Sequence, residues 1–260
     1  MIKPIVVALA NQKGGVGKST TAINLAAALA FQEQRVLLID LDPQGNASSG
    51  LGIDRGAIEM SIYDVLLKES PLEDAIEPTS VRNLFVVPAT IDLAGAEIEL
   101  VSMFSRETRL GHAIDEIGND FDIVLIDCPP SLGLLTVNAL TAAQEVLIPI
   151  QCEYYALEGL SQLLRNVELV TANLNPELTV SGVVLTMYDG RTKLSKEVAE
   201  QVREYFGDVA FGTVIPRSVR LSEAPSYGEP IEAFDPMSRG AIAYRQLGRE
   251  FLERHELEAR

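Results

Sequence analysis

A glycine-rich run with two lysines, near the start of the chain, has the composition of a phosphate-binding loop. Residues 13–20 read Lys-Gly-Gly-Val-Gly-Lys-Ser-Thr and stand between an apolar run and a helical pattern. Glycines let backbone N–H groups close on phosphate oxygens, and the N-terminus of the following helix attracts anions. In such a loop Lys18 reaches the β- and γ-phosphates of a nucleotide, and the Ser19 hydroxyl ligates Mg²⁺. The order strand, turn and helix therefore predicts a nucleotide site here.

The first position of this run departs from the usual spacing. The pattern G-x-x-x-x-G-K-[ST] requires glycine at position 12, where this chain has Gln12. A second lysine, Lys13, stands just inside the loop instead. Lys13 is either a solvated loop residue, a catalytic group beside the phosphates, or a group that points to a neighbouring subunit.

Three aspartates follow apolar runs and are candidates for the same site. Asp40 and Asp42 stand two residues apart after the run 36–39, so in an extended chain both side chains project to one side. At the carboxyl edge of a parallel sheet they face the nucleotide crevice, although the same residues also suit a simple turn. Asp127 ends the run 123–126 in the manner of a Walker B aspartate. We expect Asp42 to act on the attacking water, and Asp127 and Asp40 to belong to the magnesium shell.

The elements that must position these residues alternate along the chain. Apolar runs predict strands, and spacings of three and four predict helices. We expect strands at 5–9, 36–39, 84–87, 123–126, 146–148 and 180–185, and helices at 19–30, 134–143, 157–167, 194–206 and 241–252. This alternation predicts an α/β fold, a doubly wound and mostly parallel sheet with helices on both faces. We expect a single domain over residues 1–260, with a mobile glycine-rich loop at 45–60.

Composition sets limits on the partners. The chain has 21 Lys and Arg against 37 Asp and Glu, a formal net charge of −16, and two cysteines. Such a chain repels nucleic acid unless its basic residues gather in one place. Residues 187–260 carry 11 basic and 13 acidic residues, so the acidity is concentrated in the rest of the chain. No run has the roughly 20 apolar residues of a membrane span, and no secretory signal is evident, which favours the cytoplasm.

Further segments extend the pattern beyond the phosphate loop. They are Asp-Leu-Asp-Pro-Gln-Gly-Asn at 40–46, Ile-Asp-Cys-Pro-Pro at 126–130, and the segments at 153–159, 186–189 and 215–225. With these, nearly the whole chain resembles the deviant Walker A ATPases, and within them the ParA/Soj chromosome-partitioning group. Only about four residues precede the first strand, as in the short forms of this group.

The resemblance implies an ATP-dependent homodimer with ATP and Mg²⁺ as cofactors. Lys13 would reach the phosphates of the other subunit, Asp42 would position the hydrolytic water, and Glu153 would face the neighbouring nucleotide. A valine at Gly14 would clash within the loop and prevent dimerisation more than folding. The implied nucleotide-binding residues are Lys13, Gly14, Gly15, Val16, Gly17, Lys18, Ser19 and Thr20 around the phosphates, with Met187 and Pro216 at the adenine.

The resemblance also implies the macromolecular partners. The dimer would bind double-stranded DNA without sequence preference, through Arg191, Arg217 and Arg220, and would be associated with the nucleoid. A ParB-like centromere-binding protein would stimulate a weak basal ATP hydrolysis. The residues alone favour a different interpretation of this stretch, a solvated helix face with ion pairs.

Alternative functions of the same fold make different demands. A MinD-like membrane ATPase needs a basic amphipathic helix, yet residues 245–260 carry four arginines and four glutamates, so we expect no membrane partner. An iron–sulfur reductase needs a pair of cysteines in each subunit that share a cluster at the dimer interface. Cys128 adjoins Asp127 and Cys152 follows a strand, so neither lies in the expected loop. A small-molecule ligase and an ATPase that positions other cargo stay open, and His112 and His255 have no partners at catalytic spacing.

Overall fold

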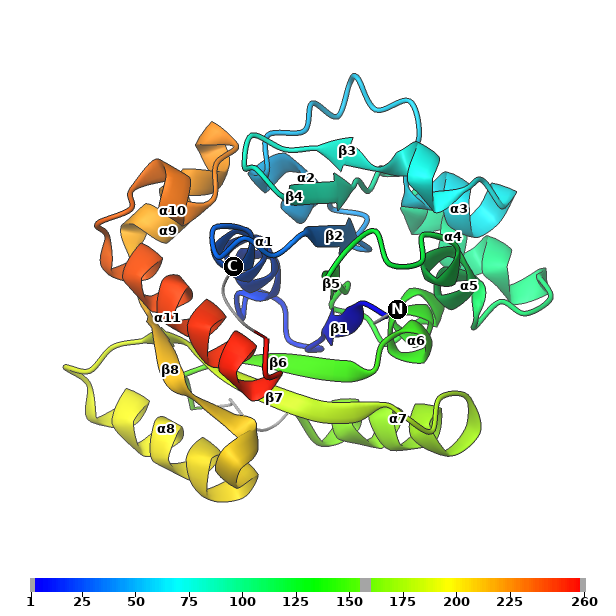
Figure 1. Cartoon of the computed structure of the whole chain (residues 1–260). Coiled ribbons are helices and arrows are strands. Elements are labelled where there is room, and N and C mark those ends of the chain that lie inside the picture. Colours follow the sequence, from blue (N-terminus) through cyan, green and yellow to red (C-terminus); the bar gives the residue numbers. More distant parts are fainter. Residues whose placement is uncertain (1–2, 155–159, 258–260) are drawn as a thin grey trace.

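The computed structural model describes residues 3–154 and 160–257, and within them an eight-stranded sheet runs through the molecule (Figure 1). The strand order is β3-β4-β2-β5-β1-β6-β7-β8, and β3 alone runs antiparallel to its neighbour. The strands are β1 Ile5–Leu9, β2 Val36–Asp40, β3 Glu77–Pro78, β4 Leu84–Val87, β5 Ile123–Asp127, β6 Glu145–Gln151, β7 Thr179–Tyr188 and β8 Ala210–Pro216. This architecture confirms the predicted fold class.

Register places the functional segments at one edge of the sheet. Leu9, the last residue of β1, pairs with Asp127 at the end of β5, and Asp40 at the end of β2 also pairs with Asp127. All residues of β2 and β5 are buried, as expected for central strands with helices on both faces. The phosphate-loop segment and two of the three aspartates therefore leave the sheet side by side.

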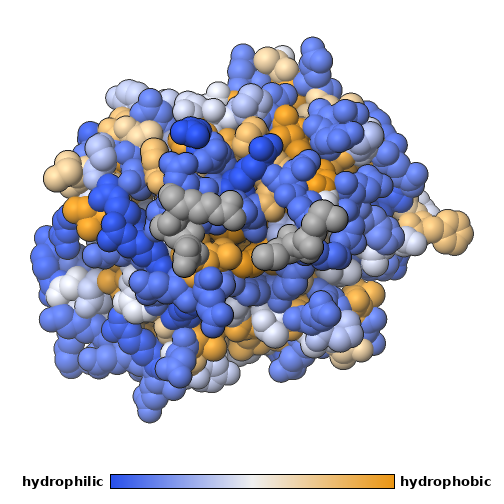
Figure 2. All heavy atoms as spheres, in the orientation of Figure 1, coloured by the Kyte–Doolittle hydropathy of each residue, from blue (hydrophilic) through white to orange (hydrophobic). Residues whose placement is uncertain are grey.

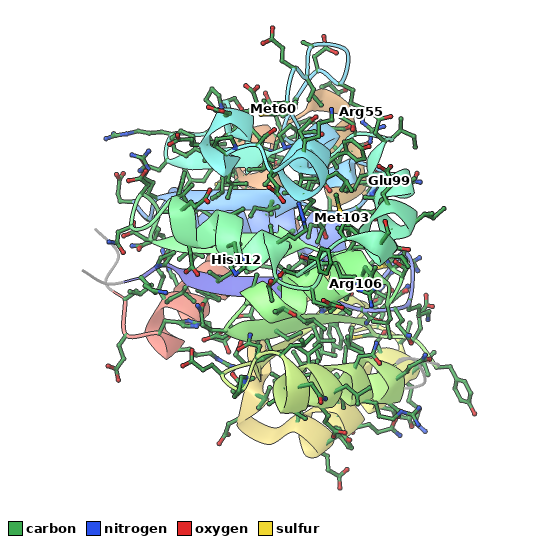
Figure 3. The ribbon with its side chains drawn as sticks, turned by 90° about the vertical axis from the view of Figure 1, so that its right-hand side faces the viewer. Arg55, Met60, Glu99, Met103, Arg106 and His112 are labelled. Atoms are coloured by element: carbon green, nitrogen blue, oxygen red, sulfur yellow. The ribbon has the colours of Figure 1, made fainter. Side chains whose placement is uncertain are left out.

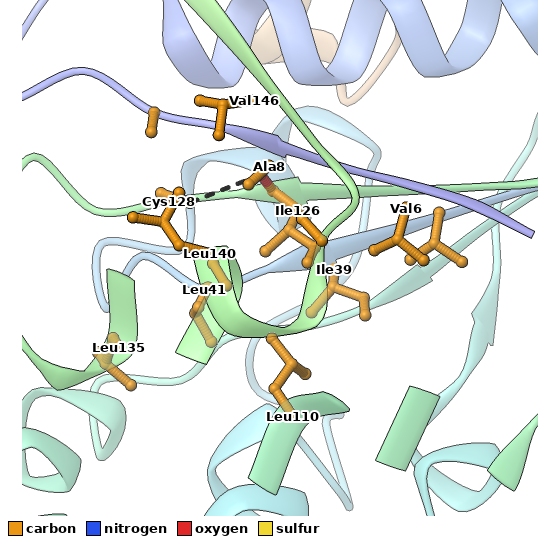
Figure 4. Packing of buried hydrophobic residues seen from close by; sticks show 14 of the residues in the cluster. Val6, Ala8, Ile39, Leu41, Leu110, Ile126, Cys128, Leu135, Leu140 and Val146 are labelled. Carbon is orange, nitrogen blue, oxygen red and sulfur yellow. Dashed lines mark hydrogen bonds between the residues drawn. The ribbon is translucent and has the colours of Figure 1, made fainter. Parts of the chain in front are cut away.

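Alternate residues of the central strands pack into two separate cores. Val7, Leu9 and Leu38 face α1 and α11, while Ala8, Ile39 and Ile126 face α3 to α8 on the opposite side. Figure 4 shows part of the second core, the cluster in which Ala8, Ile39 and Ile126 of the sheet are joined by Leu110 and Leu135. The longer helices are α1 Lys18–Ala30, α3 Ile62–Lys68, α4 Leu93–Glu99, α5 Arg109–Glu116, α6 Leu134–Ala142, α7 Leu160–Asn173, α8 Lys193–Phe206 and α11 Arg239–Arg254. Both cores share one sheet, so we keep the one-domain interpretation.

Shorter segments complete the chain, and one of them corrects a prediction. They are the helices α2 Asn46–Gly50, α9 Val219–Glu223 and α10 Ile231–Phe234, with single turns at Leu72–Ala75, Leu100–Ser102 (η2), Gly207–Val209 and Ala224–Tyr227. The glycine-rich stretch 45–60 was expected to be a mobile loop. Its first part is instead helix α2, in which Ala47 and Ser48 are fully buried.

The six predicted strands are all present, and two further strands were not predicted. β3 has only two residues, and β8 contains Gly212 and has an irregular burial pattern, so neither is a continuous apolar run. Of the helices, 19–30, 134–143, 194–206 and 241–252 agree with α1, α6, α8 and α11 within a few residues. The predicted start of the helix near residue 157 lies outside the described residues. None of the described helices is long and apolar enough to cross a membrane.

Candidate nucleotide-binding site

The loop between β1 and α1 has the backbone geometry that its glycines predict. Gly15 and Gly17 have φ angles of 75° and 87°, in the left-handed region that side chains disfavour. Gly17 precedes the first turn of α1 and accepts a hydrogen bond from the Thr21 N–H at 2.8 Å. The Thr186 hydroxyl, at the end of β7, donates to the Val16 carbonyl at 2.7 Å. The loop is therefore fixed to the sheet before any ligand arrives.

A cavity of about 690 Å³ opens between this loop and the ends of β7 and β8. It brings together most of the predicted nucleotide residues, which come from segments up to two hundred positions apart. Those that line it are Gly14, Gly15, Gly17, Lys18, Ser19, Thr20, Asp42, Met187, Pro216 and Arg217. Val16 is buried beneath the loop, while Lys13, Asp40, Asp127, Arg191 and Arg220 are not among the lining residues.

Space around Gly14 corrects one expectation. A Cβ atom built at Gly14 meets no atom within 4 Å, so the clash that we expected within the loop is absent from this chain. A side chain at position 14 would instead project into the open cavity, toward whatever approaches from outside. Any effect of a larger residue on dimerisation must arise from that approach.

Lys18 lies at the buried floor of the cavity. Its side chain is shielded from water, and burial lowers the pKa of its ammonium, while the nearby carboxylates of Asp127 and Asp42 act in the opposite direction. An ammonium in this position gains from an anion placed in the cavity above it. The loop, the helix N-terminus and Lys18 thus together favour a phosphate group.

Asp127 presents a carboxylate without ordinary partners. The residue is fully buried, and among the described residues no hydrogen bond of good length and angle reaches either oxygen. Burial and then the nearby Asp40 raise the pKa of Asp127 well above its usual range, and the hydroxyl of Ser19 lies close enough to oppose this shift. Buried carboxylates normally have partners, and a divalent cation or a water of its shell is a partner that this carboxylate could take. Ser19 and Asp127 therefore fit Mg²⁺.

Asp40 has a different environment, which argues against the expected metal role. Its Oδ2 accepts hydrogen bonds from the Ser48 N–H at 2.8 Å and the Ser48 hydroxyl at 2.7 Å, and its Oδ1 accepts one from the Asp42 N–H at 3.2 Å. Burial raises the pKa of Asp40 to about 6, and the bonds from Ser48 oppose this shift. Both oxygens are occupied within the protein, so Asp40 holds α2 against the end of β2.

Asp42 faces the cavity from the same strand end. Its Oδ1 accepts a hydrogen bond from the Gln44 N–H at 2.9 Å, which fixes the orientation of the carboxylate. The side chain is nearly buried and lines the cavity close to the phosphate loop. A fixed carboxylate in this position has the placement that a water-orienting group requires.

Lys13 is not among the residues that line the cavity of its own chain. Its Nζ lies 3.8 Å from Glu153 Oε2, and the Gln151 amide donates to Glu153 Oε1 at 2.6 Å. The Lys13 N–H donates to the side chain of Asn11, which itself binds the Pro149 carbonyl. The backbone of Lys13 is thus anchored, while its ammonium lies near Glu153 at a partly exposed position.

The far end of the cavity is apolar and suits a planar base. Pro216 pairs with Tyr188 across β7 and β8, and Met187 adopts a left-handed φ of 52° at the end of β7. Sequence reasoning did not identify the other walls at this end. They come from α1, β8, α9, the turn at Ala224–Tyr227 and α11, and their apolar character alone gave no signal: Ile23, Ile215, Leu221, Pro225 and Tyr244.

The three predicted DNA-binding arginines have unequal surroundings. Arg191 forms an ion pair with Asp189 at 2.7 Å, and Arg220 pairs with Glu223 and Asp235 at 2.8 Å each. Arg217 lies between the main cavity and a second one of about 590 Å³, which Arg191 and Arg239 also line. The sequence did not point to Arg239, the first residue of α11, because no other basic residue lies near it in the sequence.

The loop, the orphaned Asp127 and the parallel sheet define a P-loop nucleotide hydrolase, and residues 5–180 match the family described as AAA domain. The chain is 58% identical to the sporulation initiation inhibitor protein Soj of Bacillus subtilis, over 94% of this chain and 97% of that protein. It is 55% identical to the chromosome partitioning protein ParA of Myxococcus xanthus, over 96% and 88%. The chain therefore belongs to the Soj/ParA family of chromosome-partitioning ATPases.

Solved structures agree with the fold, and one of them contains a bound nucleotide. The chain is 40% identical to the cobyrinic acid a,c-diamide synthase of Mycobacterium smegmatis with bound ADP and magnesium, with a TM-score of 0.86 over 97% of this chain and 96% of that one. It is 30% identical to the cell division ATPase MinD of Pyrococcus furiosus, with a TM-score of 0.79 over 96% and 98%. These likenesses confirm the P-loop architecture.

Proposed function

We propose that this protein is an ATPase of the ParA/Soj type that dimerises around ATP, binds DNA and acts with a ParB-like partner in chromosome or plasmid segregation. The observation that carries the proposal is the buried carboxylate of Asp127, without ordinary partners, beside the phosphate loop. Relatives at 51–58% identity over nearly the whole chain, several of them named as partitioning proteins, support the same function.

ATP with Mg²⁺ is the proposed ligand. Gly14 to Thr20 would surround the phosphates, with Lys18 against the β- and γ-phosphates. Ser19 would ligate Mg²⁺, and Asp127 would hold a water of its shell. The metal would neutralise charge on the phosphates during hydrolysis. Met187 and Pro216 would border the adenine, and solved relatives with ADP, an ATP analogue and magnesium support this assignment.

Asp42 and Lys13 are the proposed hydrolytic groups. Asp42 would orient the attacking water from its fixed position on the cavity wall. Lys13 lies outside its own cavity, so its proposed target is the phosphate of a second subunit across an ATP dimer. Because Lys13 pairs with Glu153 in the single chain, dimerisation would exchange this contact for the phosphate. A weak basal rate follows, since the site is incomplete without its partner.

DNA is the proposed macromolecular ligand of the arginine-lined surface. Two of the proposed arginines, Arg191 and Arg217, line the second cavity, and Arg220 follows β8. They belong to residues 187–260, which carry 11 basic and 13 acidic residues. Two such surfaces in a dimer would bind phosphates without reading sequence, and binding would weaken steeply with salt. The protein would then work on the nucleoid in the cytoplasm, without a membrane partner.

The test compares Asp42→Ala with the unchanged protein and with Asp208→Ala, an exposed control. We expect Asp42→Ala to bind ATP and to elute as an ATP-dependent dimer, while hydrolysis is lost. The unchanged protein should be retained on duplex DNA with ATP only, and less so in Arg217→Ala. A variant that hydrolyses ATP normally would contradict the role of Asp42, and DNA retention of equal strength without ATP would contradict the cycle.

A cargo-positioning ATPase of the same fold is the second candidate. It shares the nucleotide cycle and differs in the partner, so hydrolysis measured with and without the ParB-like protein distinguishes the two. A ligase acting on a small carboxylic acid would instead require ATP consumption that depends on that acid, and the higher identity to partitioning proteins disfavours it.

A further inference from the structure

A group of exposed apolar side chains lies far from the DNA surface, on the face covered by α3 to α8. Ile98 on α4, Val101 on η2 and Phe104 just beyond are 79%, 59% and 95% exposed. Ile98 and Val101 are three residues apart, so they share one side of the helical segment. Figure 2 shows apolar atoms protruding at the right-hand edge, where Figure 1 places α4 and α5. We call Ile98, Val101 and Phe104 the α4 surface.

The turn that carries Phe104 is held in place by the protein. Ser105 has a left-handed φ of 52°, and the guanidinium of Arg106 donates to the Val101 carbonyl. Asn138 of α6, which is fully buried, donates to the Arg106 carbonyl at 2.7 Å and accepts from the Leu110 N–H at 3.2 Å. Figure 3 views this side of the molecule face on and labels Glu99, Met103 and Arg106 there. The fold therefore presents a large apolar side chain to water at a fixed place.

The charges around the α4 surface are mainly negative. Asp92 directly precedes α4, and Glu97 and Glu99 lie on it. The cations in this region are already paired, Arg106 with Glu107 at 2.8 Å and Lys68 with Asp64 at 2.7 Å. An acidic surface disfavours both DNA and a second copy of this acidic chain. It favours a partner that combines apolar side chains with lysines or arginines.

The α4 surface is also connected to the nucleotide site. The hydroxyl of Ser131 donates to Glu97 Oε1 at 3.3 Å, and a Cβ atom at Gly133 would overlap the Glu97 carboxylate. Both residues belong to the loop that leaves β5 after Asp127 and begins α6, and Pro130 of this loop lines the main cavity. Glu97 therefore places α4 in direct contact with the loop beside the Walker B aspartate.

We propose that the α4 surface docks a basic amphipathic helix of a partner protein. The apolar side of that helix would cover Ile98, Val101 and Phe104, and its lysines or arginines would face Asp92, Glu97 and Glu99. Docking would alter hydrolysis through the contact between Glu97 and Ser131. This inference rests on the proposed ATPase function, and it adds the site and the chemistry of the regulatory partner.

The first experiment measures binding of the purified ParB-like protein from the same cell as the probe. The double variant Ile98→Ser/Phe104→Ser should bind it at least about tenfold more weakly, because central aromatic side chains dominate such contacts. Tyr205→Ser is the matched control, since Tyr205 on α8 is an aromatic residue with 66% exposure. Basal hydrolysis and ATP-dependent elution on gel filtration should be unchanged in both variants.

The possible results distinguish a failure of the docking site from a failure of the proposed ATPase function. Unchanged binding in the double variant, an equal loss in Tyr205→Ser, or an unchanged protein that hydrolyses ATP but does not bind the probe would overturn the docking site. Loss of the ATP-dependent dimer in the double variant would assign the surface to a second copy and would overturn it too. An unchanged protein without ATP hydrolysis would instead overturn the proposed function.

A second variant isolates the connection to the nucleotide site. Glu97→Gln keeps the three apolar residues and weakens the contact with Ser131. We expect binding of the probe to stay within about threefold, as for loss of one charge at the rim of an interface, while stimulation of hydrolysis falls by more than half. Full stimulation in Glu97→Gln would remove the proposed route through Ser131.

Discussion

The ends of β2 and β5 carry the same residue in the same register, yet the two carboxylates have opposite environments. Asp40 and Asp127 pair across the strands, and both are fully buried. Asp40 accepts three hydrogen bonds from Ser48 and Asp42, whereas among the described residues no such bond reaches Asp127. Asp40 is satisfied within the fold, whereas both oxygens of Asp127 stay available to a ligand. Of these two neighbouring aspartates, Asp40 therefore serves the stability of the fold and Asp127 serves the function of the site.

The strongest test of this comparison is Asp127→Asn. We expect hydrolysis to fall on the order of 10³-fold, because a buried group placed for transition-state charge or its metal is lost. The free protein should unfold at a higher temperature, because an amide removes a buried carboxylate that lies near Asp40. Hydrolysis assays with Mg²⁺ and thermal unfolding without ligand measure the two effects.

Asp208→Asn, at an exposed position, serves as the control and should change neither quantity. A drop in the unfolding temperature of Asp127→Asn would mean that its carboxylate already has a stabilising partner in the free protein. The contrast with Asp40 would then disappear.

The pH dependence of stability provides the next test. Burial raises the pKa of Asp40 from 3.8 to about 6, and it raises that of Asp127 as well. Both folded carboxyls therefore hold protons more tightly than in the unfolded chain, so the free energy of unfolding falls as pH rises from about 4 through 6. For Asp40 alone the loss is at most about 3 kcal/mol.

Urea unfolding at several pH values measures this slope, and Asp127→Asn should reduce it without abolishing it. His255 adds a separate loss at higher pH. Glu145 and the Phe251 carbonyl both accept from its ring, and these bonds outweigh burial and raise its pKa. His255→Gln removes that part, so a slope between pH 4 and 6 that vanishes in His255→Gln would contradict the carboxylate origin.

Most of the sheet was predictable from the sequence because its central strands are buried on both faces. Runs such as 36–39 and 123–126 read as strands without ambiguity, and the phosphate loop followed from residues that are neighbours in sequence. The edge strand β8 and the short helix α2 have no such runs, so they were missed.

The two corrections at the site, for Gly14 and for Asp40, have one cause. The space beside Gly14 and the bond between Ser48 and Asp40 depend on distant segments, which spacing within one segment does not reveal.

Ser48→Ala tests the structural role of Asp40, and we expect it to have a smaller effect than Asp127→Asn or the change in pH. The Ser48 hydroxyl donates to Asp40 Oδ2 at 2.7 Å and accepts from the Ala89 N–H at 3.0 Å. Its removal therefore leaves the buried Ala89 N–H without this acceptor, while Asp40 Oδ2 keeps only the bond from the Ser48 N–H. We expect a loss of about 2 kcal/mol in the free energy of unfolding. The rate of hydrolysis under saturating ATP should change less than about threefold, because Asp42 and Asp127 keep their positions. A threefold change in rate corresponds to about 0.65 kcal/mol in activation free energy.

The matched control is Ser102→Ala, which removes an exposed bond to the Glu99 carbonyl and should cost less than about 0.5 kcal/mol. Urea unfolding and steady-state hydrolysis on the same samples separate the two carboxylates. If Ser48→Ala lowers hydrolysis as strongly as Asp127→Asn does, while the protein stays folded, then Asp40 takes part in the reaction. The division between a structural and a metal-holding aspartate would then have to be replaced by a shared pair, in which the bond from Ser48 decides which carboxyl is charged.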